Sequence, residues 1–68
     1  MNMGEEEKIK KELSVLQREH KQLELKIEET LKQSVFDQLL IQRLKKRKLW
    51  LKDRISELES SLYDDIIA

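Results

Sequence analysis

The single histidine, His20, is the residue best suited to acid–base chemistry, because a histidine side chain exchanges a proton near neutral pH. It falls at a core position of an apolar heptad repeat, so it could act as a pH-sensitive switch whose charged form is costly to bury. The interpretation we favour is a polar layer that fixes the register of two packed helices, with Lys48 and Leu51 as its neighbours. No serine or cysteine adjoins it to complete a catalytic triad, so we expect no enzyme activity and no metal site.

A basic band in the second half of the chain offers a different chemistry, the neutralisation of nucleic-acid phosphates. A nucleic-acid-associated protein would use Arg43, Lys45, Lys46, Arg47, Lys52 and Arg54. Trp50 stands alone, so aromatic stacking on single strands is nearly absent. We favour a solvated helix face whose lysines pair with glutamates, and nucleic-acid binding is the alternative function.

A stripe with aromatic and basic character points to protein binding. At about 100° per residue, one narrow arc of a helix holds Phe36, Leu39, Arg43, Trp50 and Arg54. Tryptophan and arginine are enriched in binding hot spots, so the stripe predicts a surface for a second copy of the chain or for another protein. The equally weighted interpretation is that Phe36, Leu39 and Val35 close the tip of a hairpin together with Leu31 and Leu40, which leaves Trp50 as a lone exposed ring.

Composition excludes several other classes of site. The chain has no cysteine, which rules out disulfides and thiolate zinc sites. Apolar runs never exceed three residues, so we expect no membrane span, no signal-peptide core and a cytoplasmic location. Fourteen basic and fourteen acidic residues balance in the 68-residue chain. We expect no cofactor and no small-molecule substrate.

The elements that position these residues follow from the heptad repeat. Its core positions are spaced by four and three residues and are Ile9, Leu13, Leu16, His20, Leu23 and Ile27, then Ile41, Leu44, Lys48, Leu51, Ile55, Leu58 and Leu62. Only helices that pack along a narrow seam need this pattern. The sequence therefore predicts an all-α fold, a two-helix antiparallel hairpin resembling a coiled coil, with self-association left open.

Three successive polar core positions, Thr30, Ser34 and Asp37, interrupt the repeat and mark the turn. Acidic residues at 5–7 favour a helix start there. We expect one domain over residues 1–68, with a first helix over about 5–32, a turn over about 33–35, a second helix over about 35–63 and a loose tail over 64–68. Ser34 and Asp37 match the spacing of a capping box at the start of the second helix.

Folding the chain about Val35 and Phe36 gives every apolar core residue a partner. The expected layers are Ile9 with Leu62, Leu13 with Leu58, Leu16 with Ile55, His20 with Leu51, Leu23 with Lys48 and Ile27 with Leu44. The expected flanking pairs are Glu24 with Lys45, Glu19 with Arg54 and Lys10 with Glu59, against one clash between Lys26 and Arg47. An antiparallel dimer of two long helices would form the same layers between chains, but the hairpin is favoured because it needs no second molecule.

The segment from Leu44 to Ile55, LKKRKLWLKDRI, together with the helical spacing of His20, Leu23 and Ile27, resembles the YdcH-like family of very small bacterial proteins. The resemblance covers about residues 20–58. It implies an antiparallel helical hairpin in a bacterial cytoplasm, without enzyme activity and without site residues to transfer. Members of that family often carry Glu at the positions of Arg47 and Arg54, so the basic band here departs from the family pattern.

These observations predict a small interaction module that associates with itself or docks on a protein. The partner-binding residues we expect are Phe36, Leu39, Arg43, Trp50 and Arg54.

Overall fold

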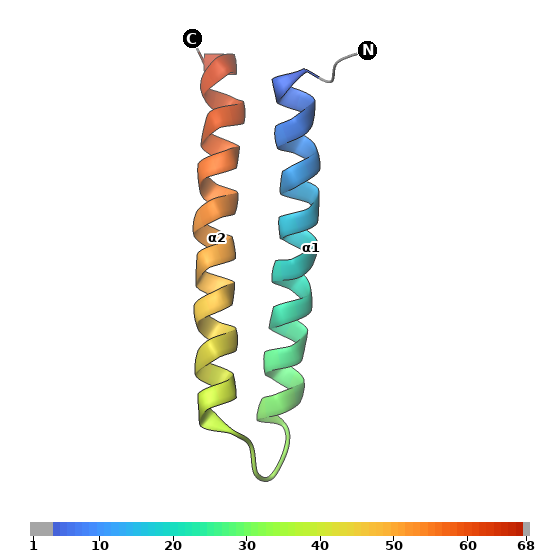
Figure 1. The fold of residues 1–68 in the computed structure, drawn as a ribbon, viewed down its shortest axis with the longest axis vertical. Helices are drawn as coiled ribbons and strands as arrows, with labels where there is room; N and C mark the ends of the chain where they lie inside the picture. The colour runs from blue at the N-terminus through green and yellow to red at the C-terminus, as the bar shows by residue number, and fades with distance from the viewer. Residues whose placement is uncertain (1–3, 68) are drawn as a thin grey trace.

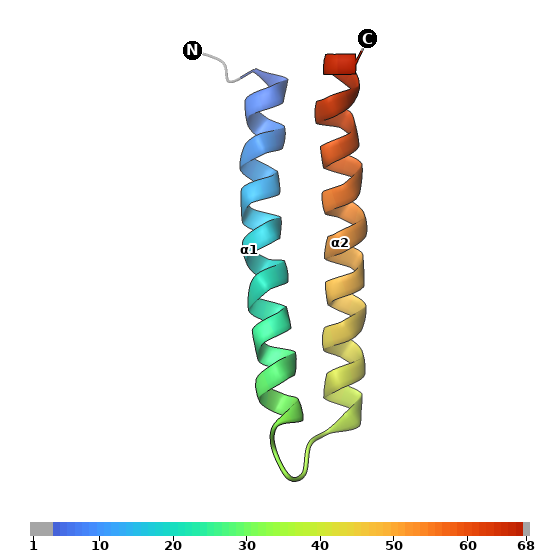
Figure 2. The same ribbon diagram turned by 180° about the vertical axis from the view of Figure 1, so that it is seen from behind.

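Two long helices lie side by side in antiparallel orientation, with both chain ends at one end of the molecule and the connection at the other (Figures 1 and 2). A computed structural model describes the backbone of residues 4–67 and the side-chain surroundings of residues 4–62. Helix α1 spans Glu5–Leu31 and helix α2 spans Gln38–Ile67. The rod measures 51 × 26 × 15 Å. The predicted all-α hairpin is confirmed.

Helix α1 begins where the acidic residues indicate. Gly4 precedes it in an extended conformation and makes no side-chain cap, so Glu5, Glu6 and Glu7 supply the favourable charge in its first turn. At the other end the Thr30 hydroxyl donates a hydrogen bond of 2.7 Å to the carbonyl oxygen of Lys26. The backbone N–H of Lys32 donates to the carbonyl of Glu28, which satisfies one of the free carbonyls of the last turn.

Helix α2 begins three residues later than predicted, and Asp37 rather than Ser34 caps it. The Asp37 carboxylate accepts hydrogen bonds from the backbone N–H groups of Leu39 at 2.9 Å and Leu40 at 3.4 Å. These are the second and third residues of the helix, the usual donors to an N-cap side chain. The connection therefore includes residues 32–37, and Phe36 lies in it instead of on the helix.

The end of α2 also differs from the prediction. The helix continues to Ile67 instead of stopping near residue 63, and Ala68 lies outside the described residues. Acidic residues near a helix C-terminus cost only about 0.3–1 kcal/mol each. The chain has no proline, and its single glycine is Gly4, so nothing near the end of α2 forces the helix to stop there.

The core is the predicted seam. Its cluster of buried leucines consists of Leu13, Leu16, Leu51 and Leu58, with Ile9, Leu23, Ile55 and Leu62 packed against it. Ile27 and Ile41 are also buried, nearer the connection. Leu51 is fully buried, which makes it the central residue of a core only one side chain deep.

Ion pairs join the helices along the flanks of the seam, but with partners other than those expected. Arg47 bonds Glu19 at 3.2 Å, Arg54 bonds Glu12 at 3.4 Å and Lys48 lies 3.7 Å from Glu24. The glutamates at 12 and 19 and the arginines at 47 and 54 are each seven residues apart. Antiparallel helices can therefore satisfy both arginines at once, whereas the predicted pairing of Glu19 with Arg54 would satisfy one and set Arg47 against Lys26.

The remaining expected pair also differs. Lys10 lies 3.2 Å from Glu6, one turn earlier on its own helix, rather than pairing with Glu59. Pairs between exposed side chains contribute only about 0.2–1 kcal/mol, so these differences do not disturb the helix pairing that the apolar seam sets.

Replacing Leu51 with Ala should lower the free energy of unfolding by about 2–5 kcal/mol, because the truncation leaves a cavity at a side chain that is fully buried. Urea unfolding followed by circular dichroism at 222 nm measures the loss. Leu25→Ala is the matched control, because Leu25 is 48% exposed and its loss should change stability by less than about 0.5 kcal/mol. Equal losses in the two variants would contradict the assigned core.

The cap of α2 gives a second test. Asp37→Ala should lower the free energy of unfolding by about 1 kcal/mol, because two backbone N–H groups lose their acceptor. Ser34→Ala should lie within about 0.5 kcal/mol of the parent, since Ser34 is exposed in the connection. Thermal unfolding of both variants compares them directly, and a larger effect at Ser34 would reinstate it as the cap.

Candidate functional site

The outward side of α2 carries apolar side chains that the seam does not use. Leu39 is 67% exposed, Leu49 is 60% exposed and Trp50 is 52% exposed. Arg43 is also exposed, and residues 39, 43 and 50 fall within about 40° of one another at about 100° per residue. Three of the five predicted partner-binding residues therefore share one face of the helix.

The other two predicted residues lie elsewhere. Phe36 is half-buried in the connection, outside the helix whose spacing placed it on the stripe. Arg54 lies toward α1, where its guanidinium donates hydrogen bonds to Glu57 at 3.1 Å and Glu12 at 3.4 Å. The hydrogen bond to Glu57 and the charge of Glu12 raise the pKa of Arg54 above its ordinary value. Arg54 therefore joins the two helices at the edge of the stripe.

The second interpretation of the stripe was a closed apolar tip, and the structure does not form one. Val35 is 86% exposed, and Leu39, Leu31 and Leu40 are exposed as well. Apolar side chains in a closed cluster would shield one another from water. The exposed residues of α2 therefore remain available to a partner.

Sequence reasoning missed Leu49 as a member of this surface. It adjoins Trp50 and points away from the seam, at a heptad position where polar residues are usual. An apolar residue at such a position is the signal in the sequence. Leu49 lies about 100° around the helix from Trp50, so the narrow arc of the predicted stripe did not include it. We call Leu39, Leu49 and Trp50 the outer apolar patch.

Trp50 is held in place by its own helix. The guanidinium carbon of Arg47 lies 4.7 Å from the centre of the indole ring, a cation–π contact. The same guanidinium bonds Glu19 on α1, so the ion pair also orients the arginine over the ring. One side of the indole is thus supported from within the chain while half of its surface stays exposed.

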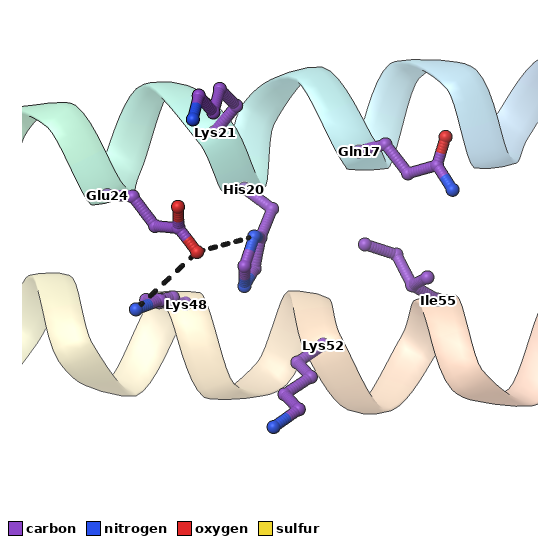
Figure 3. Close-up of a pocket in the computed structure, with 7 residues that line it drawn as sticks. All are labelled: Gln17, His20, Lys21, Glu24, Lys48, Lys52 and Ile55. Carbon is purple, nitrogen blue, oxygen red and sulfur yellow. Dashed lines mark ion pairs between the residues drawn. The ribbon is translucent and has the colours of Figure 1, made fainter.

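The six residues of the nucleic-acid alternative do not gather on one face. Arg47 and Arg54 pair with glutamates of α1 along one flank of the seam. Lys52 lines a hollow with Lys48 and His20, and Figure 3 shows its side chain leading away from His20. Arg43, Lys45 and Lys46 are exposed and, at about 100° per residue, point in different directions around α2. Two of the six charges are therefore matched by acids, and the others are spread around the helix.

His20 reaches from α1 toward α2 within the seam, as the polar-layer interpretation predicts (Figure 3). Its Nδ1 lies 3.4 Å from Glu24 Oε1, the same oxygen that faces the Lys48 ammonium. Its Nε2 is buried without a hydrogen-bond partner among the described residues. Lys48 is a neighbour of His20, as expected.

The hollow beside His20 measures about 400 Å³ and is lined by Gln17, His20, Lys21, Glu24, Lys48, Lys52 and Ile55. None of these side chains carries a hydroxyl or thiol that the histidine could activate as a nucleophile. In the described part of the chain, no group of three or more His, Cys, Asp or Glu residues could hold a metal ion. Over the same residues, neither helix is apolar enough along its length to cross a membrane.

Replacing His20 with Leu should raise the free energy of unfolding by about 1–3 kcal/mol, because the change removes a buried nitrogen to which residues 4–62 offer no hydrogen-bond partner. Urea unfolding compares it with Gln17→Leu, a control that adds an apolar side chain at an exposed position of the same hollow. A destabilised His20→Leu variant would show that Nε2 finds a partner in solution.

Comparison with known proteins identifies one family. The model of the family described as "Protein of unknown function (DUF465)" matches residues 13–59. Neither the curated proteins nor the solved structures include a significant match. The matched residues run from the buried Leu13 in α1 to the residue after the buried Leu58 in α2, so they include both sides of the seam and the connection. The chain therefore belongs to the DUF465 family, the YdcH-like family that its second helix resembles.

Proposed function

We propose that the hairpin is a non-enzymatic interaction module that binds another helix through the outward side of α2. The observation that carries the proposal is the outer apolar patch, in which Leu49 and Trp50 expose more than half of their surfaces side by side. Contiguous apolar groups exposed to water favour burial against a partner. Arg43 flanks the patch and would orient that partner by charge.

The shape of the surface favours a helix as the partner. Leu39, Leu49 and Trp50 follow α2 at spacings of ten and one residues, which keeps them on one side of the helix. An apolar stripe along a helix is matched by the stripe of a second helix packed lengthwise. Arg47 supports the indole ring, so little freedom of Trp50 is lost on binding.

The seam separates folding from binding. Leu51 follows Trp50 directly and is fully buried against α1, whereas Trp50 is 52% exposed. A substitution at Trp50 therefore removes surface from the partner without removing a core side chain. This separation makes the proposed function testable by single substitutions.

Trp50→Ala should weaken partner binding by about 30-fold or more, the effect expected for a central aromatic hot spot. Placing a photoreactive benzoylphenylalanine at Leu49 in the full chain and irradiating living cells should give covalent adducts, and adding Trp50→Ala should remove most of them. Leu25→Ala, on the exposed side of α1, is the control and should leave the adducts unchanged. Circular dichroism should show the same helicity in all variants.

No adduct at Leu49, or equal adduct yields with and without Trp50→Ala, would overturn the proposed function. Adducts to nucleic acid in place of protein, with a yield that falls steeply with salt after lysis, would support the nucleic-acid alternative instead.

A further inference from the structure

We propose that the partner of the outer apolar patch is a second copy of this chain, bound with its α2 antiparallel to the first; this inference rests on the proposed function. The outward side of α2 carries charge of opposite sign on either side of Leu49 and Trp50. Arg43 and Lys46 precede Leu49, whereas Asp53 and Glu57 follow Trp50. All four side chains are exposed.

Two of these charges, Lys46 and Asp53, are symmetric about the point between Leu49 and Trp50. Lys46 lies three residues before Leu49, and Asp53 lies three residues after Trp50. Arg43 is symmetric with Ser56 about the same point, and Glu57 is the next residue after Ser56. A two-fold axis through this point would set Lys46 of one copy opposite Asp53 of the other and bring Arg43 to within one residue of Glu57. Each basic residue then lies near an acidic residue of the other copy, as a self-complementary interface requires.

Size is complementary along the same axis. Leu39 lies ten residues before Leu49, and Ser60 lies ten residues after Trp50. Ser60 helps to line a hollow of about 530 Å³ with Asp53, Ser56, Glu57 and Ser61. The exposed Leu39 of the second copy would enter this hollow, where small serine side chains leave room for it.

The charges are available for such a contact. Among the ion pairs of the described residues, none engages Arg43, Lys46 or Asp53. Glu57 accepts a hydrogen bond from Arg54 through one oxygen, which leaves the other oxygen for a second arginine. Asp53 and Glu57 also flank Trp50 in a hollow of about 660 Å³.

Only one orientation of the second copy satisfies these charges. Parallel helices would place Arg43 against Arg43 and Asp53 against Asp53, and like charges at close range repel. In the antiparallel orientation four attractive contacts form, two on each side of the apolar centre. The assembly is then a four-helix arrangement with the two α2 helices inside and α1 of each copy outside.

Charge reversal in two separate variants tests the pairing. Arg43→Glu with Lys46→Glu makes one variant, and Asp53→Lys with Glu57→Lys makes the other. Sedimentation equilibrium should give a dimer for the parent chain and a dissociation constant at least about 10-fold higher for each variant alone, because reversed charges face like charges. An equimolar mixture should restore parental affinity, because all four contacts become attractive again.

Disulfide trapping tests the orientation, since the parent chain has no cysteine. A mixture of Leu39→Cys and Ser60→Cys chains should form a crosslinked heterodimer on mild oxidation, whereas Leu39→Cys alone should not, because its two copies would lie about 30 Å apart along antiparallel helices. Crosslinking of Leu39→Cys to itself with none to Ser60→Cys would overturn the antiparallel dimer.

A parent chain that is monomeric at every concentration, or a dimer that neither charge-reversed variant weakens, would also overturn the inference. The proposed function would survive that result if the Leu49 photo-adducts had masses other than twice that of the chain and still depended on Trp50. If the chain neither dimerises nor gives photo-adducts at Leu49 that depend on Trp50, the outer apolar patch is not a binding surface.

Discussion

The rest of the structure depends on a single strip of apolar contact between α1 and α2. Leu13, Leu16, Leu51 and Leu58 form its buried cluster, and no second layer exists behind them in the described residues. Two helices can bury only one face each against the other, so most of the molecular surface remains in water. The angular position of a residue around its helix, relative to this strip, decides whether its side chain is buried, lies at a flank or faces water. The ion pairs at its flanks depend on it for their geometry and contribute little by themselves.

The same constraint explains why apolar residues outside the strip are exposed to water. A hairpin this thin has no further core in which Leu39, Leu49 or Trp50 could be buried. Their exposure costs free energy in water, and burial against a partner helix recovers it. In the proposed dimer, the basic residues before Leu49 and the acidic residues after Trp50 would orient that contact. The proposed association would use the side of α2 away from the seam, so it could change without a change in folding.

His20 shows how a polar group is accommodated in a single-layer core. Its ring enters the seam, where Nε2 is buried without a hydrogen-bond partner in the described part of the chain, while Nδ1 approaches the Glu24 carboxylate that also faces Lys48. A leucine would bury more apolar surface here. A polar seam residue disfavours shifted registers, because a shift would separate it from its polar partners. It lowers stability relative to leucine but makes one register of the two helices more specific.

The sequence by itself determined the two helices, their antiparallel pairing and the residues of the core, because a repeat of four and three residues allows only one buried face per helix. It also predicted Leu39, Arg43 and Trp50 on one outward face. Only the tertiary structure decided that Asp37 caps α2, that Phe36 leaves the stripe, that Arg54 turns toward Glu12 and that Leu49 joins the surface. Alternative helix caps and alternative surface ion pairs differ in free energy by only about 1 kcal/mol or less, so periodicity alone cannot rank them.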